Sequence, residues 1–226
     1  MRRRSSSPVP GGVADRASAP ENAAAAPAVS EQSTRGELLL RALTAAGGVG
    51  VGGLLVGSFA GSAASAPSPA QDVRILNYFL LLEYLQARLY EEARTADALT
   101  GELRRFAEVA GAHEREHVDA LRAVLAGDAR PTPAFRFGQA VENDRRFAAA
   151  ALTVEETAAA AYIGQAANLT RKQTRTIARI VPVEARHAAW IRAIVHREPA
   201  PHAADPARTP QQVERTIRRT GFVKAR

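Results

Sequence analysis

From residue 71 onward, apolar side chains recur every three or four positions, which is the spacing of one face of an α-helix. The pattern predicts four helices, near Asp72–Ala96, Thr100–Leu125, Ala140–Asn168 and Arg171–His196. Proline and glycine mark the longer break between the second and third helices, at Ala126–Gly138. Pro182 lies inside the fourth helix and should bend it or leave a carbonyl unpaired.

The lengths of the connections predict how these helices are arranged. The first and third connections are very short, so each joins two antiparallel neighbours, whereas the middle one is long enough to cross the bundle. Hydrophobic residues make up 46% of the chain but aromatic ones only 5%, and the alanine excess favours closely packed helices. We therefore expect an all-α, antiparallel four-helix bundle with a longer connection between helices two and three.

Each of the four apolar rows is interrupted by a glutamate, and two of these are followed by a histidine three residues later. Residues three apart lie on the same face of a helix, so each Glu-x-x-His pair can bind one metal ion. The spacing from the first to the second glutamate is 31 residues and from the third to the fourth 29, so the chain resembles two similar hairpins. The candidate ligands are Glu83, Glu114, His117, Glu155, Glu184 and His187.

Buried carboxylates explain why this pattern predicts a metal site. Each ionised carboxylate in an apolar interior costs several kcal/mol unless it is compensated, and two divalent cations would cancel the four charges. Carboxylate and imidazole ligands suit iron or manganese, and zinc also fits. A single Glu-x-x-His is most often a solvated helix face, but two such pairs with two further glutamates in apolar rows favour the metal site.

The motifs around these residues resemble the ferritin-like di-metal carboxylate superfamily, and more closely the exported bacterial ferritin-like family that includes desiccation-related proteins. The resemblance covers about residues 71–223, including the closing segment Thr209–Val223. Its motifs are Leu81-Leu82-Glu83-Tyr84-Leu85, His113-Glu114-Arg115-Glu116-His117-Val118, Val154-Glu155-Glu156-Thr157 and Val183-Glu184-Ala185-Arg186-His187-Ala188-Ala189-Trp190.

By this resemblance, Glu114 and Glu184 would bridge two metal ions. Glu83 and His117 would complete the ligands of one ion, and Glu155 and His187 those of the other.

Several positions stay open. Spacing alone does not separate Glu155 from Glu156, although the family pattern favours Glu155. His113 either contacts a ligand or lies at the surface. Tyr90 and Tyr162 either donate hydrogen bonds to ligands or only fill the core.

The two ends of the chain differ from the bundle. We interpret residues 1–34 as a disordered extension and residues 35–66 as a twin-arginine-like export signal, although Gly36 replaces the second arginine. An uncleaved anchor that associates with the membrane through residues 42–64 and a flexible linker are the alternatives. The bundle is expected at 71–198, followed by a tail at 199–226 whose Thr209-Pro210 starts a short helix.

Charge and cysteine content exclude several classes of function. Most of the net charge of +7 arises at the ends, because residues 72–195 hold 17 basic and 16 acidic side chains. The body therefore offers no basic face for nucleic acid. Cysteine is absent, which excludes disulfides and thiolate chemistry.

The sequence thus favours an exported oxidoreductase that uses a di-iron or di-manganese centre with O2 or peroxide, in a ferroxidase-like or catalase-like reaction. A non-catalytic stress or desiccation protein of the cell envelope with a structural metal site is the second hypothesis. Iron storage is the third, but the long N-terminal segment would obstruct a closed shell; a homodimer is one candidate assembly.

Overall fold

A computed structural model describes residues 66–224 of the chain. The expected extension at 1–34 and residues 35–65 of the expected export signal lie outside the described residues. In the described part, no helix is long and apolar enough to cross a membrane.

The described residues form helices joined by loops, and they contain no β-strand beyond one isolated bridge between Phe135 and Val223. This confirms the predicted all-α bundle. The α-helices are α2 (Pro69–Thr95), α3 (Gly101–Leu125), α4 (Asp144–Gln165), α5 (Arg171–Ile177), α6 (Val181–Ile194) and α7 (Pro210–Thr220). Short 3₁₀ turns follow or precede them at η1 (Ala126–Asp128), η2 (Gly138–Val141) and η3 (Ala166–Asn168).

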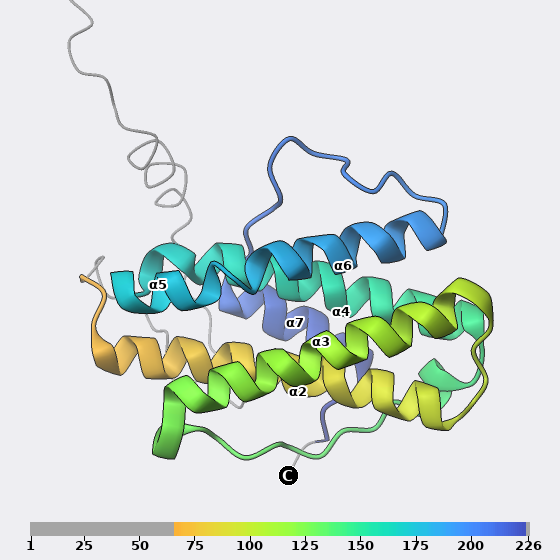
Figure 1. Cartoon of the computed structure of the whole chain (residues 1–226), viewed down its shortest axis with the longest axis horizontal. Helices are drawn as coiled ribbons and strands as arrows, with labels where there is room; N and C mark the ends of the chain where they lie inside the picture. Colours follow the sequence, from red (N-terminus) through yellow and green to blue (C-terminus); the bar gives the residue numbers. More distant parts are fainter. Residues whose placement is uncertain (1–65, 225–226) are drawn as a thin grey trace, which may run out of the picture.

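The long helices pack as two antiparallel hairpins, α2 with α3 and α4 with α6 (Figure 1). The connection between α3 and α4 runs along the whole bundle, so that α4 starts at the same end as α3 (Figure 1). It is the longer connection that the sequence predicted.

Aspartates in the first turn of one helix hold the start of another. Asp72 of α2 accepts a hydrogen bond from the backbone N–H of Thr170, just before α5, at 2.8 Å. Asp144 of α4 accepts the matching bond from the N–H of Thr100, just before α3, at 2.9 Å. Asp72 and Asp144 are 72 residues apart, and Thr100 and Thr170 are 70 residues apart. The two hairpins are therefore related by an approximate two-fold repeat.

The expected fourth helix is divided in two. Instead of one helix over Arg171–His196, α5 ends at Ile177 and α6 begins at Val181, with Pro182 in the first turn of α6. Proline has no N–H to donate to the preceding turn, which explains why the α-helix is interrupted there. The third helix also starts later than expected, at Asp144, because the Asn143 side chain accepts from Arg146 N–H and caps it.

The end of the chain packs against the bundle. Helix α7 begins at the predicted Thr209-Pro210, where a capping box with Gln212 closes its first turn, and it buries Val213 and Ile217. Before it, Arg208 N–H donates to the carbonyl of Ala160 in α4 at 3.0 Å.

Candidate metal centre

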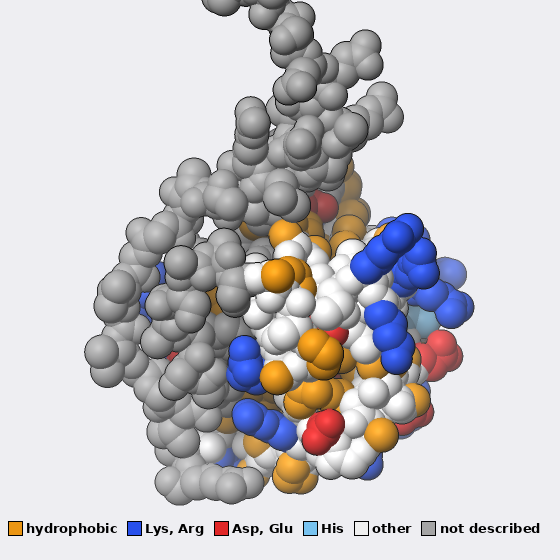
Figure 2. All heavy atoms as spheres, turned by 90° about the vertical axis from the view of Figure 1, so that its left-hand side faces the viewer, with side chains coloured by type: hydrophobic (Ala, Val, Ile, Leu, Met, Phe, Trp, Pro, Cys, Tyr) orange, Lys and Arg blue, Asp and Glu red, His pale blue; other side chains and the backbone are white. Residues whose placement is uncertain are grey.

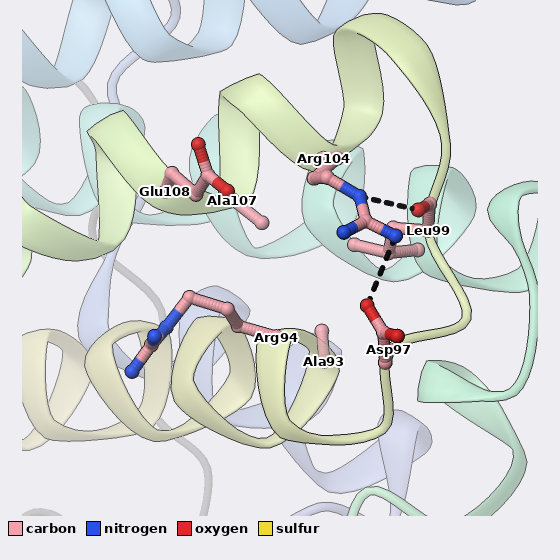
Figure 3. A pocket seen from close by; sticks show the side chains of 7 residues that line it. All are labelled: Ala93, Arg94, Asp97, Leu99, Arg104, Ala107 and Glu108. Atoms are coloured by element: carbon pink, nitrogen blue, oxygen red, sulfur yellow. Dashed lines mark hydrogen bonds and ion pairs between the residues drawn. The ribbon is translucent and has the colours of Figure 1, made fainter.

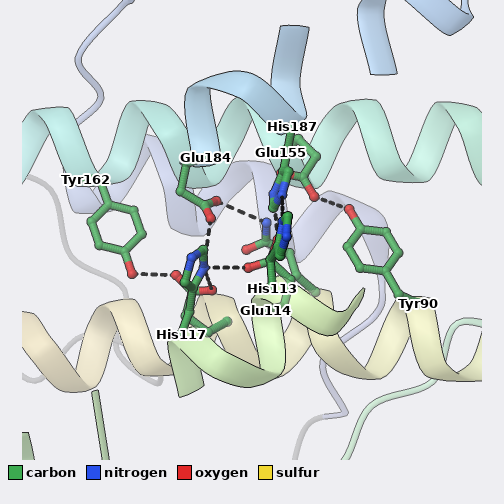
Figure 4. A network of polar contacts seen from close by, with 10 residues as sticks. Tyr90, His113, Glu114, His117, Glu155, Tyr162, Glu184 and His187 are labelled. Carbon is green, nitrogen blue, oxygen red and sulfur yellow. Dashed lines mark hydrogen bonds and ion pairs between the residues drawn. The ribbon is translucent and has the colours of Figure 1, made fainter. Parts of the chain in front are cut away.

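Six polar side chains from four helices meet inside the bundle (Figure 4). The four glutamates have no exposed surface, His117 is 8% exposed and His187 is 3% exposed. We call these residues the Glu/His cluster: Glu83 on α2, Glu114 and His117 on α3, Glu155 on α4, and Glu184 and His187 on α6. All six residues that the sequence singled out are therefore brought together.

One half of the cluster surrounds His117. Its Nδ1 lies 2.9 Å from Glu114 Oε2, 3.1 Å from Glu184 Oε1 and 3.3 Å from Glu83 Oε2. One ligand atom from each of these four residues lies within 4.8 Å of the others, which is close enough for all four to contact one ion.

The other half surrounds His187. Its Nδ1 lies 2.8 Å from Glu114 Oε1 and 3.6 Å from Glu155 Oε2, and Glu184 completes a second group within the same 4.8 Å limit. Glu114 and Glu184 belong to both groups. The two groups therefore share two carboxylates.

The structure separates Glu155 from its neighbour Glu156. Glu155 is fully buried in the cluster, whereas Glu156 pairs with Arg192, whose Nε and Nη2 lie 2.8 and 2.7 Å from its carboxylate. Consecutive helix residues point about 100° apart, so only one of the two can face the interior.

Both tyrosines donate hydrogen bonds to the cluster, and each one reaches across to the other hairpin (Figure 4). Tyr90 O–H of α2 donates to Glu155 Oε1, and Tyr162 O–H of α4 donates to Glu83 Oε1. Burial, followed by the charge of the same carboxylate, raises the pKa of each tyrosine, so both keep their proton. This answers the question that the sequence left open.

Comparison with protein families gives an independent result. The model of the ferritin-like domain matches residues 71–197, which is more than half of the chain and includes the whole Glu/His cluster. The chain belongs to the ferritin-like domain family. A search of curated proteins found no match.

Three carboxyls of the cluster in this ferritin-like domain have raised pKa values. Burial, and next the charge of Glu114, raises the pKa of Glu83 to about 8. Burial and the charge of Glu83 raise the pKa of Glu184 to about 7, and burial and the charge of Glu184 raise the pKa of Glu114. Without cations, these groups must share protons near neutral pH.

The pKa values of His117 and His187 are raised, whereas burial lowers the pKa of most histidines. Burial lowers the pKa of His117, but its contacts with Glu114, Glu184 and Glu83 outweigh this and raise it to about 12. For His187, burial is likewise outweighed by Glu114 and Glu155, and its pKa rises to about 10. Positive charge is therefore strongly favoured at both places.

Four buried atoms of the cluster make no hydrogen bond of good geometry, although each lies close to another ligand atom: Glu114 Oε1, Glu155 Oε2, Glu184 Oε1 and His187 Nδ1. Buried polar atoms without well-formed hydrogen bonds are costly, whereas each of these atoms is a good ligand for a divalent cation. Carboxylate oxygens with imidazole nitrogens fit iron, manganese or zinc, so the residues present fit a pair of metal ions.

Two further residues contact the cluster from outside. Gln86 Nε2 donates to Glu184 Oε2 at 3.3 Å, and His113 Nδ1 lies 2.9 Å from His187 Nε2. Sequence reasoning missed Gln86, although it lies three residues after Glu83 and so on the same face of α2. His113 was left open, and the structure places it beside His187 (Figure 4).

Two hollows on the described surface are lined by residues outside the Glu/His cluster. One, of about 20 Å³, lies between α2 and α3, where Arg104 donates to Leu99 O and pairs with Asp97 (Figure 3). The other lies along η3 and α5, at the end of the bundle where hydrophobic side chains are mixed with Lys and Arg (Figure 2). Neither contains a histidine, and neither includes a residue of the Glu/His cluster.

Proposed function

We propose that this ferritin-like protein binds two divalent metal ions, iron or manganese, in the Glu/His cluster and uses them as an oxidoreductase with O2 or peroxide. The observation that carries the proposal is the pair of overlapping ligand groups, which share Glu114 and Glu184 in a fully buried interior. Glu83 and His117 would complete one position, and Glu155 and His187 the other.

Charge supports the number of ions. The cluster holds four carboxylates, and two divalent cations carry the four positive charges that neutralise them. One ion would leave carboxylates that must protonate, because unpaired charge in this interior is costly. Neutral imidazoles complete each ligand set without adding charge.

Burial supports small reactants. All four carboxylates have no exposed surface, so whatever reacts there must be small, such as O2, hydrogen peroxide or a ferrous ion. When bound, a pair of iron or manganese ions supplies two-electron redox chemistry. The chain's own part is to hold the carboxylates in place through Tyr90 and Tyr162 and to exclude bulk water from them.

We propose export on the sequence pattern at residues 35–66, and the desiccation-related type on the motifs around the ligands. The protein would then act in the cell envelope or outside the cell, where it would remove peroxide or oxidise ferrous iron. Direct identification of the mature N-terminus in protein purified from the native host tests export: cleavage near the end of the expected signal at residues 35–66 supports it, and an intact cytoplasmic chain contradicts it.

Turnover measurements test the reaction. Protein loaded anaerobically with Fe(II) or Mn(II) is assayed for consumption of O2 and of hydrogen peroxide, beside Glu114→Gln and the control Glu116→Gln, which changes an exposed residue of the same helix. Loss of turnover in Glu114→Gln alone supports the oxidoreductase. If the loaded wild type shows no turnover while Glu114→Ala lowers the melting temperature, the ions have the structural role instead.

A further inference from the structure

The two halves of the cluster follow the approximate repeat of the chain. Glu83 and Glu155 are 72 residues apart, and His117 and His187 are 70 apart. The same offsets relate the helix-start pairs described above. Adding 72 to a residue number of α2, or 70 to one of α3, therefore gives the equivalent residue near the other half of the cluster. Positions where the two equivalent residues differ in type can then be compared directly.

Two polar neighbours of the cluster break this repeat. The equivalent of His113 is Val183, and the equivalent of Gln86 is Ala158. Neither valine nor alanine has a side-chain atom that can form the hydrogen bonds that His113 and Gln86 make. These two polar contacts therefore have no equivalents in the other half of the repeat.

Both departures act on ligands of α6. Gln86 donates to Glu184, and His113 contacts His187. This helix begins only at Val181, after the interruption at residues 178–180, so that Glu184 lies in its first turn. Terminal turns are held by fewer backbone hydrogen bonds, and bonds from α2 and α3 compensate for this.

The contact between the histidines specifies where a proton must lie. His187 turns Nδ1 toward the carboxylates and Nε2 toward His113 Nδ1, 2.9 Å away. To bind a metal through Nδ1, a neutral His187 must carry its proton on Nε2 and donate it to His113 Nδ1. His113 then acts as the acceptor that keeps the ligand nitrogen free of a proton.

We propose that His113 is a positioning residue that holds His187 in its metal-binding tautomer and makes the two metal positions unequal, with the His187 position binding more tightly than the His117 position. The inference rests on the proposed function. A partner that accepts from a ligand imidazole orients the ring and increases its basicity, and loss of such a partner typically lowers metal affinity by about 10–100-fold.

The chain provides matched variants for the test. His113→Val installs the residue of the equivalent position, His113→Asn keeps an acceptor oxygen near the place of Nδ1, and Val183→His offers a partner to His117. Metal-free proteins are titrated with Mn(II), and free Mn(II) is counted by its electron paramagnetic resonance signal. In the Zn(II)-loaded proteins, nitrogen NMR of labelled histidine reads the tautomer of each ring.

Wild type should bind two Mn(II) ions with unequal constants. His113→Val should weaken the tighter constant about tenfold or more and change the other little, His113→Asn should restore most of the loss, and Val183→His should strengthen the weaker one. In Zn(II)-loaded His113→Val, the Nε2–H resonance of His187 should shift or broaden.

Three results would overturn the inference: His113→Val leaves both constants unchanged, it weakens both equally, or His113→Asn is as weak as His113→Val. Each requires a wild type that binds two ions. A wild type that binds fewer than two instead removes the proposed function, so the two failures are distinguishable.

Discussion

Replacing Glu83 with glutamine should stabilise the metal-free protein, and metal binding should cancel this gain. The side chains have nearly the same shape, and the glutamine oxygen can still accept the hydrogen bond from Tyr162. What the substitution removes is the ionisable carboxyl, which is fully buried.

The size of the effect follows from the pKa of Glu83, which is raised from 4.5 to about 8. A carboxyl whose pKa is higher in the folded state carries no penalty below pH 4.5, and the penalty grows as pH rises through the window from 4.5 to 8. At pH 7 the unfolded carboxyl is ionised and the folded one is still protonated, so the difference is about 3 kcal/mol.

Metal-free Glu83→Gln should therefore be more stable than wild type by about 3 kcal/mol at pH 7 and about equal to it at pH 4.5. With saturating Mn(II) this advantage should disappear: if the lost ligand weakens binding about a hundredfold, about 3 kcal/mol of metal-linked stability is lost, which cancels the metal-free gain. Glu116→Gln, on the exposed face of α3, should change neither value by more than about 0.5 kcal/mol.

Urea unfolding at several pH values, with chelator or with Mn(II), measures all of these free energies. A metal-free Glu83→Gln that is less stable than wild type at pH 7, or whose advantage does not grow between pH 4.5 and 8, would refute the reasoning. It would mean that the interior tolerates this carboxylate without a cation.

Three other predictions concern the cluster and its support. Metal binding should displace protons from the carboxyls with raised pKa values and from both histidines, so Mn(II) affinity should rise from pH 6 to pH 8. Calorimetry in buffers of different ionisation enthalpy would show the released protons. If no protons are released, the assigned charges are wrong. Tyr90→Phe removes the hydrogen bond to Glu155 and should weaken Mn(II) binding with little change in helix content, whereas unchanged binding would reduce Tyr90 to packing. Gly164→Ala would place a Cβ 2.0 Å from the backbone oxygen of Arg208. It should displace the final segment from α4 and lower the free energy of thermal unfolding by about 2 kcal/mol. In the control Gly127→Ala, the added Cβ meets no atom within 4 Å, so stability should hardly change.

The local sequence pattern was sufficient to predict that the chain is a helical bundle and that the six candidate ligands face its interior. Glu114 with His117, and Glu184 with His187, are three residues apart on one helix, so their shared direction follows from helix geometry alone. Their convergence follows because each lies in the apolar row that must face the core.

Features that depend on other helices could not be predicted. Spacing alone did not separate the adjacent Glu155 and Glu156, although the family resemblance favoured Glu155; in the structure Glu156 pairs with Arg192 of α6. The contacts of Gln86 and His113 likewise join residues more than 70 positions apart. Spacing within one helix carries no information about such pairs.

The interruption of the fourth helix was foreseen as a bend at Pro182 but not as two separate helices. Pro182 removes one backbone hydrogen bond of the helix because it has no N–H. Whether the helix then bends or breaks depends on how its two parts pack against the bundle. The burial of Val213 and Ile217 of α7 is a similar case, because the local pattern predicted the helix and its start while its docking depends on the bundle.

Anomalous diffraction from crystals of the Mn(II)-loaded protein tests the central claim most directly. We predict two manganese peaks inside the bundle, one among Glu83, Glu114, His117 and Glu184 and the other among Glu114, Glu155, Glu184 and His187. A map with no peak at these positions, or with manganese bound on the surface alone, would contradict the account.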